Sequence, residues 1–256
     1  MFQPHSFLWH YLWVAPNLLL AALAIILSKR GLHRELRAFC VYAWFQVIEW
    51  SVLYPMDLIP SVPAAGYWRV CWASLLIESI TVFILISDLF ADVFGSYTAL
   101  AHLGRRLIRW GGVLLLITAT MAGAGAADAY PYWYIPASLA VQEGMYIVVS
   151  GLVLLLFAAA AYFRLAWNHR VFGIALGLGI NGCVHLATWA IMANGLLFDK
   201  SRLLNMANMA TSHVVVLMWF YYLLVPVPHK ASAKPVVLPE NNLALWNREL
   251  ERLLQQ

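Results

Sequence analysis

The sequence predicts an all-α integral membrane protein: a bundle of seven transmembrane helices with its N-terminus outside the membrane and its C-terminus in the cytosol. Of the 256 residues, 63% are hydrophobic and only 11% are charged, whereas a soluble domain has about a quarter of its residues charged. Seven stretches also come close to the roughly 20 apolar residues that a helix needs to cross a bilayer. The composition therefore excludes a water-soluble protein.

Hydropathy divides residues 1–225 into seven apolar runs separated by short polar stretches. The runs are Phe7–Leu27, Arg37–Tyr54, Tyr67–Phe90, Trp110–Ala127, Ala137–Tyr162, Val171–Ala193 and Leu204–Val225. The first run lacks the basic start and the small-residue cleavage site of a signal peptide, so we expect it to remain as a span. In the sixth run, Gly173 and Gly177 are expected to let a neighbouring helix pack closely.

Basic residues are distributed unevenly between the two ends of the predicted spans. Thirteen of the 16 Lys and Arg residues lie on one side, in the segments after the first, third, fifth and seventh runs. The other side carries Arg69, Lys200 and Arg202. Because cytosolic loops are enriched in Lys and Arg, this asymmetry predicts the orientation given above. The basic excess is explained by orientation, so no nucleic-acid partner is expected.

The sequence after the last span changes in composition. Residues 226–240 hold four prolines and predict an extended cytosolic linker. Residues 241–256 place Leu243, Trp246 and Leu250 at helical spacing, which predicts an amphipathic C-terminal helix. Its charges nearly cancel, so we expect it either to dock onto a cytosolic or membrane protein partner or to adsorb to membrane lipids.

Among the ionisable residues inside the predicted spans, where each costs roughly 2.5–3.5 kcal/mol on insertion scales, five stand out: Glu49, Glu78, Glu143, His185 and His213. Each belongs to a polar stripe with spacings of three and four residues, and polar faces in a bundle turn inward. We therefore predict an outward-facing polar cavity that binds a small or lipophilic ligand. The predicted ligand-binding residues are Glu49, Glu78, Glu143, Tyr146, Asn181, His185 and His213.

Several functions are compatible with such residues. Ligand binding is typical of a receptor, a sensor or a complex subunit. Buried glutamates can act as general acids, so an enzyme that transfers protons on an isoprenoid- or lipid-like substrate is the alternative. His185 and His213 lie at similar depth on consecutive spans and could ligate a metal or a haem. Separate interhelical hydrogen bonds are the structural alternative. A retinal Schiff base is excluded, because the seventh run contains no lysine.

Two resemblances add expectations of their own. Through "FLWHYLWVAPNLLLAAL" and "HRVFGIALGLGI", the chain resembles an uncharacterised family of bacterial seven-helix inner-membrane proteins, which implies a multi-pass protein of the bacterial inner membrane. The segment "AWFQVIEWSVLYP", with the size and helix count, is similar to membrane-integral terpene cyclases. That similarity implies an acidic site residue at Glu49. These cyclases pair it with an acid in the last helix, where this sequence has His213.

Overall fold

In a computed structural model, the chain is described over residues 6–94, 134–163, 167–193 and 201–225, together with 106, 109–114, 117, 121, 132, 165 and 252. None of the described residues forms a strand, so this part of the protein is all-α, as the sequence predicts. The chain divides into two units, Met1–Val225 and Pro226–Gln256. The predicted linker 226–240 and helix 241–256 lie outside the described residues, apart from Arg252.

Six long helices lie at the positions of six predicted spans. They are α1 (Phe7–Lys29), α2 (Arg37–Leu58), α3 (Ala64–Phe94), α5 (Tyr134–Tyr162), α6 (His169–Ala193) and α7 (Ser201–Leu224). A short 3-10 helix, η1 (Leu32–Arg34), connects α1 to α2. The predicted fourth span, Trp110–Ala127, lies mostly outside the described residues.

Five of these helices are long and apolar enough to cross a membrane. They are α1, α3, α5, His169–Ile191 of α6 and Leu203–Leu224 of α7. With 22 residues, α2 extends roughly 33 Å, but Gln46, Glu49 and Asp57 interrupt its apolar sequence. The described helices therefore indicate a membrane protein, while the count of seven spans and the orientation of the termini stay predictions.

Local interactions fix the first helices of the chain. The Ser6 hydroxyl oxygen accepts a hydrogen bond from the backbone N–H of Trp9 at 3.3 Å, which caps the start of α1. Gly31 follows the end of α1 with φ of 72°, a left-handed conformation that glycine adopts without strain. This residue allows the chain to turn sharply into η1, so that α2 returns alongside α1.

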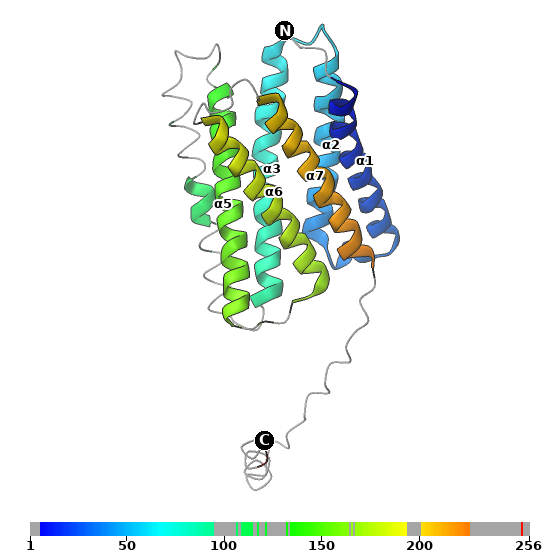
Figure 1. The fold of residues 1–256 in the computed structure, drawn as a ribbon, viewed down its shortest axis with the longest axis vertical. Helices are drawn as coiled ribbons and strands as arrows, with labels where there is room; N and C mark the ends of the chain where they lie inside the picture. Colours follow the sequence, from blue (N-terminus) through cyan, green and yellow to red (C-terminus); the bar gives the residue numbers. More distant parts are fainter. Residues whose placement is uncertain are drawn as a thin grey trace. The chain divides into compact units, whose positions relative to one another are not determined.

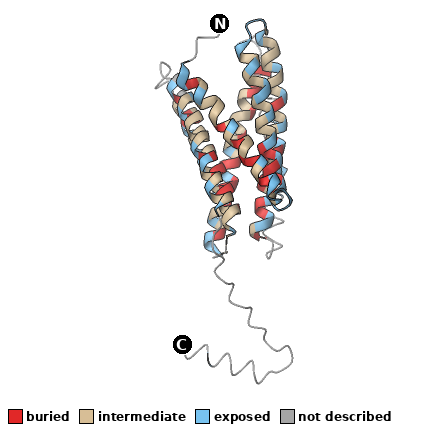
Figure 2. Cartoon of the chain, turned by 90° about the vertical axis from the view of Figure 1, so that its right-hand side faces the viewer, coloured by how far each residue is buried: buried red, intermediate tan, exposed pale blue. Residues whose placement is uncertain are grey.

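The six helices form a closed ring (Figure 1). In ring order, α1 packs against α2, followed by α3, α5, α6 and α7, and α7 packs against α1. Buried residues lie where the helices face one another and exposed residues lie on their outer faces (Figure 2). Leu23, Phe39, Leu85 and Leu156 are fully buried in the resulting core. Ring closure brings the inner faces of all six helices to a common centre.

The contact between α6 and α7 depends on two glycines of α6. A Cβ atom added at Gly173 would meet the Tyr222 side chain. One added at Gly177 would meet the indole of Trp219, including Cε2 at 2.8 Å. The prediction that these glycines allow close helix packing is confirmed, and the helix that packs against them is α7.

Candidate functional site

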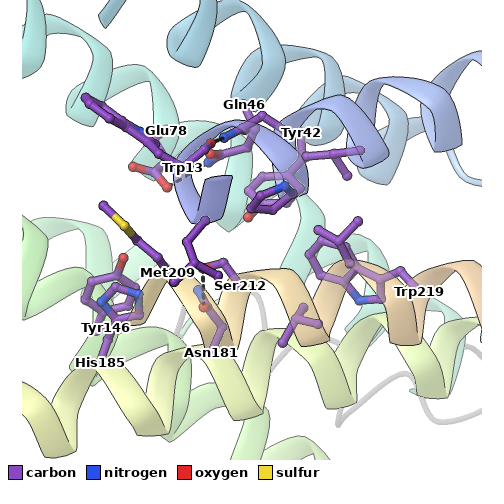
Figure 3. Close-up of a pocket in the computed structure, with 16 residues that line it drawn as sticks. Trp13, Tyr42, Gln46, Glu78, Tyr146, Asn181, His185, Met209, Ser212 and Trp219 are labelled. Carbon is purple, nitrogen blue, oxygen red and sulfur yellow. Dashed lines mark hydrogen bonds between the residues drawn. The ribbon is translucent and has the colours of Figure 1, made fainter. Parts of the chain in front are cut away.

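A polar cavity of about 210 Å³ lies at the centre of the helix ring (Figure 3). Each of the six helices contributes to its wall. The polar and aromatic residues that line it are Trp13, Asn17, Tyr42, Gln46, Glu78, Tyr146, Asn181, His185, Ser212 and Trp219. The apolar part of the wall includes Leu20, Met209 and Val216. Residues from distant parts of the sequence therefore converge on one small space.

A second cavity of about 260 Å³ adjoins this central cavity. The two cavities share lining residues from four helices: Trp13, Asn17, Gln46, Glu78 and Tyr146. The second cavity adds Glu49, Trp50 and Cys71, together with Gln142 from α5. Glu78 and Tyr146 therefore border both spaces.

Glu78 lies close to the middle of α3, roughly 21 Å from its start along a helix of roughly 46 Å. Its Oε1 atom accepts a hydrogen bond of 2.8 Å from Nε2 of Gln46, which links α3 to α2. Glu49 faces the second cavity, close enough to Glu78 to interact with it electrostatically, and the Ser74 hydroxyl lies beside it. Among the described residues, no Lys or Arg lines either cavity. These two carboxyl groups therefore face the cavities without a Lys or Arg partner.

His185 and Tyr146 form the opposite wall of the central cavity. Their rings stack with centroids 4.2 Å apart and planes 15° apart, which joins α6 to α5. The Gln142 side chain lies beside the Tyr146 hydroxyl group. Figure 3 shows the stacked rings across the cavity from Trp13 and Gln46. This wall offers hydrogen-bonding groups together with flat apolar surface.

Further polar groups on α1, α6 and α7 complete the cavity wall. The Ser212 hydroxyl donates a hydrogen bond of 3.3 Å to Oδ1 of Asn181, and the Asn181 amide NH₂ stays available as a donor. Asn17 donates to the Trp13 carbonyl oxygen at 2.8 Å. Pro16 has no N–H, so the carbonyl of Leu12 lacks its usual helical donor. Both Leu12 and Pro16 line the cavity.

The structure brings five of the seven predicted ligand-binding residues together. Glu49, Glu78, Tyr146, Asn181 and His185 line one or both of the cavities. Glu143 and His213 line neither, and the residues immediately before them, Gln142 and Ser212, take those positions. Successive side chains of a helix point about 100° apart. Choosing the wrong one of two adjacent polar residues therefore selects a side chain that does not face the cavity.

His213 lies instead against α1. Its ring centroid is 5.7 Å from that of Tyr11, and its buried Nδ1 atom has no hydrogen-bond partner among the described residues. His185 and His213 therefore do not share a cavity, as joint ligation of a metal or haem would require. Within the described ranges, no group of three or more His, Cys, Asp and Glu side chains is placed to hold a metal ion.

The contribution of α1 was not predicted from the sequence. Trp13 and Asn17 face both cavities, and Leu20 extends their stripe at intervals of four and three residues. A signal was present: Asn17 is a polar residue inside an otherwise apolar span and directly follows Pro16. A single amide between large apolar residues does not by itself show which side of a helix faces the bundle.

The arrangement suits a small molecule with both polar and apolar parts. Carboxyl, amide and carbonyl oxygens can accept hydrogen bonds from it, while Trp13, Tyr42 and Trp219 offer aromatic surface. The protein groups that supply this chemistry come from all six helices of the ring. The chain matches no protein-family model, no curated protein and no solved structure.

Proposed function

We propose that the protein is a seven-transmembrane protein of the bacterial inner membrane that binds a small ligand in the cavity at the centre of its helix ring. Five apolar helices long enough to span a bilayer support the membrane location. The concentration of Lys and Arg on one side supports an external N-terminus and a cytosolic C-terminus. Such a protein acts as a receptor, a sensor or the ligand-binding subunit of a complex.

The observation that carries this proposal is a cavity into which six helices, each with an apolar exterior, all contribute side chains, many of them polar. Polar side chains within a membrane cost free energy unless they are paired. A bundle that is stabilised by packing alone does not require a cavity lined by such side chains. Here polar groups from α1, α2, α3, α5, α6 and α7 face one space instead of filling it. A ligand that pairs with these groups accounts for their convergence.

The chemistry of the wall indicates the kind of ligand. Glu49 and Glu78 favour a cation or a strong hydrogen-bond donor, because among the described residues no Lys or Arg lines the cavities. Aromatic side chains such as Trp13 and Tyr146 can hold a cation against their faces. A volume of about 210 Å³ is below the ~300–1,000 Å³ of drug-sized sites. We therefore expect a small amine or a neutral donor with an apolar body.

Mass spectrometry of compounds that copurify with the protein tests the proposal. The full chain, Asn181→Leu and Asn205→Leu would be purified in the same mild detergent, denatured and extracted. Asn181 lines the cavity, whereas Asn205 is an exposed residue of α7, so the second variant makes the same chemical change outside the site.

A compound present with the wild type and Asn205→Leu, but lost with Asn181→Leu, would support the cavity as a binding site. Identical extracts from all three proteins would overturn it. If Asn181→Leu elutes as aggregate in gel filtration, Glu78→Gln replaces it, because this change keeps the size of the side chain and removes its acidic group.

A further inference from the structure

A second, apolar groove lies on the outer surface of the ring, away from the central cavity. It has a volume of about 840 Å³ and is formed by α2, the adjoining face of α3 and the end of α1 with η1. Its lining residues are Ser28, His33, Arg37, Cys40, Val41, Trp44, Phe45, Ile48, Ile77 and Thr81. None of them lines either of the two central cavities. The groove is therefore a separate feature of the fold.

Large apolar side chains in this groove are exposed. Val41, Trp44 and Ile48 of α2 have exposed fractions of 54%, 38% and 58%. Within the described residues, the ring neighbours of α2 are α1 and α3. The described helical segment 109–114 lies elsewhere, because Gly111 is adjacent to Val148 of α5 and Gly112 to Phe83 of α3. The described part of the chain therefore leaves this apolar face uncovered.

One end of the groove is basic. Arg37, Val41, Trp44 and Ile48 follow one another at spacings of four, three and four residues, so they share one face of α2. The Arg37 Nε atom donates a hydrogen bond of 3.2 Å to the Arg34 carbonyl oxygen, which leaves its terminal nitrogens as donors. His33 of η1 lies at the same end. The groove is therefore basic at one end and apolar along the rest of its length.

The nearest acid in sequence does not neutralise this end. Glu35 forms an ion pair with Arg170 of α6, with 2.7 Å between its Oε2 atom and Nη1. Asp88 and Asp92, close to the end of α3, do not line the groove. Arg37 can therefore pair with an anion that comes from outside the described protein.

The length of the apolar part matches one leaflet of a bilayer. From Arg37 to Ile48, α2 rises roughly 16 Å at 1.5 Å per residue. Half of a hydrocarbon core of about 30 Å is about 15 Å. A molecule with an anionic group at Arg37 and a chain along Val41, Trp44 and Ile48 has the dimensions of a phospholipid in that leaflet.

We propose that this groove is a binding site for an anionic phospholipid. The lipid phosphate lies against Arg37 and His33, and one acyl chain follows the exposed face of α2 toward Ile77 of α3. A guanidinium group suits this role, because it donates two hydrogen bonds to phosphate oxygens at once. The lipid would cover apolar surface that the described helices leave open.

Native mass spectrometry in mild detergent tests the proposal. Dioleoyl phosphatidylglycerol and dioleoyl phosphatidylcholine are added separately to the full chain and to its variants, and the affinity for the first bound lipid is measured. Arg37→Gln removes the proposed phosphate ligand, and Arg34→Gln removes an exposed charge at the same end that does not line the groove. Trp44→Ala removes part of the wall, and Trp110→Ala is its exposed control outside the groove.

We expect phosphatidylglycerol to bind more tightly than phosphatidylcholine. Arg37→Gln should weaken phosphatidylglycerol binding by about fivefold, the factor that one basic side chain contributes near an anionic surface. Arg34→Gln should change it by less than about twofold, because salt screens a charge outside the site. Trp44→Ala should weaken both lipids, whereas Trp110→Ala should weaken neither.

Three results would overturn the site. The first is equal binding of the two lipids, and the second is an equal loss with Arg37→Gln and Arg34→Gln, which indicates general charge attraction. The third is a dimer of the wild type that Trp44→Ala dissociates, which would assign the groove to a second copy of the chain. Thermal unfolding of each variant confirms that the compared proteins are folded.

Discussion

Trp219 shows how a single residue serves both packing and the cavity in this protein. Its exposed fraction is 3%, and its ring contacts Phe39 edge-on at 5.1 Å between centroids. Its other edge lies against Gly177 of α6, and part of its side chain lines the central cavity. The position of this indole, and therefore one wall of the cavity, depends on the absence of a side chain at residue 177.

The substitution Gly177→Ala should therefore destabilise the protein. A methyl group at this position would overlap the Trp219 indole, and overpacking of this kind costs about 1–3 kcal/mol. Gly151→Ala is the matched control, because a Cβ atom at Gly151 has no neighbour within 4 Å. Thermal unfolding in detergent should show a lower midpoint for Gly177→Ala than for Gly151→Ala. Equal midpoints would contradict the close contact between α6 and α7.

Residue-level reasoning from the sequence agreed with the position of a side chain on the cavity wall where a polar residue had no alternative role. Glu78 was predicted because a carboxyl group in the middle of an apolar span needs a polar surrounding. Glu143 lines neither cavity, because Gln142 and Glu143 are adjacent polar residues and the sequence does not show which one faces inward. Trp13 was missed for another reason: a tryptophan close to the end of a span is equally typical of the membrane interface.

At the scale of helices, α6 and α7 are joined by hydrogen bonds as well as by glycine contacts. The Thr188 hydroxyl donates a hydrogen bond of 3.0 Å to Oδ1 of Asn208, and both residues are buried. The bond between Ser212 and Asn181 lies closer to the cavity along the same interface. The polar stripes seen in the sequence therefore serve two purposes, since some residues hold helices together and others line the cavity.

A double-mutant cycle on Thr188→Val and Asn208→Leu should reveal this hydrogen bond. Interhelical hydrogen bonds in membrane proteins contribute about 0.6 kcal/mol on average and up to about 1.7 kcal/mol, so the two losses of stability should be coupled by an amount in this range. Thr188→Val and Ser79→Ala provide the control, because Ser79 bonds within α3 and to Met145 of α5. Additive losses in both cycles would show that the α6–α7 bond contributes nothing measurable.

The sequence predicted the positions of the helices better than it predicted which helices pack against one another. Six of the predicted spans coincide with helices to within a few residues, because apolar length depends on composition alone. The order of packing around the ring depends on side-chain shape at each interface, such as the fit of Trp219 against Gly177, which periodicity does not encode. For this reason the sequence indicated that a polar cavity exists but did not include α1 in its wall.

At the scale of the whole molecule, the distribution of charge predicts the orientation in the membrane. With three cysteines in the natural chain, Cys40, Cys71 and Cys183, labelling requires a background in which all are replaced. Ser61→Cys lies in the exposed turn between α2 and α3, and we expect a membrane-impermeant maleimide to label it in intact cells. Ser232→Cys should be labelled after cell lysis and not before. The reverse pattern would contradict the proposed orientation.

The charge of the cavity wall predicts selectivity between related probe molecules. Tryptamine carries an ammonium group and indole-3-acetate a carboxylate on the same ring system, and only the first complements Glu49 and Glu78. Tryptamine should therefore raise the unfolding temperature of the full chain, since a ligand that binds the folded state stabilises it. The effect should be lost in Glu78→Gln and retained in Asn205→Leu. A larger shift with indole-3-acetate would contradict the expected ligand class.

Closure of the ring by α1 and α7 has a consequence for biogenesis. Among the described helices of the ring, α1 is synthesised first and α7 last, and the wall of the cavity includes Trp13 from α1 and Ser212 from α7. At the far end of the pair, Arg30 donates a hydrogen bond of 3.3 Å to the Leu224 carbonyl oxygen, at the C-terminus of α7. A nascent chain halted before α7 has no enclosed cavity, whatever its other helices have already formed. The cavity wall therefore cannot be complete before α7 has been synthesised.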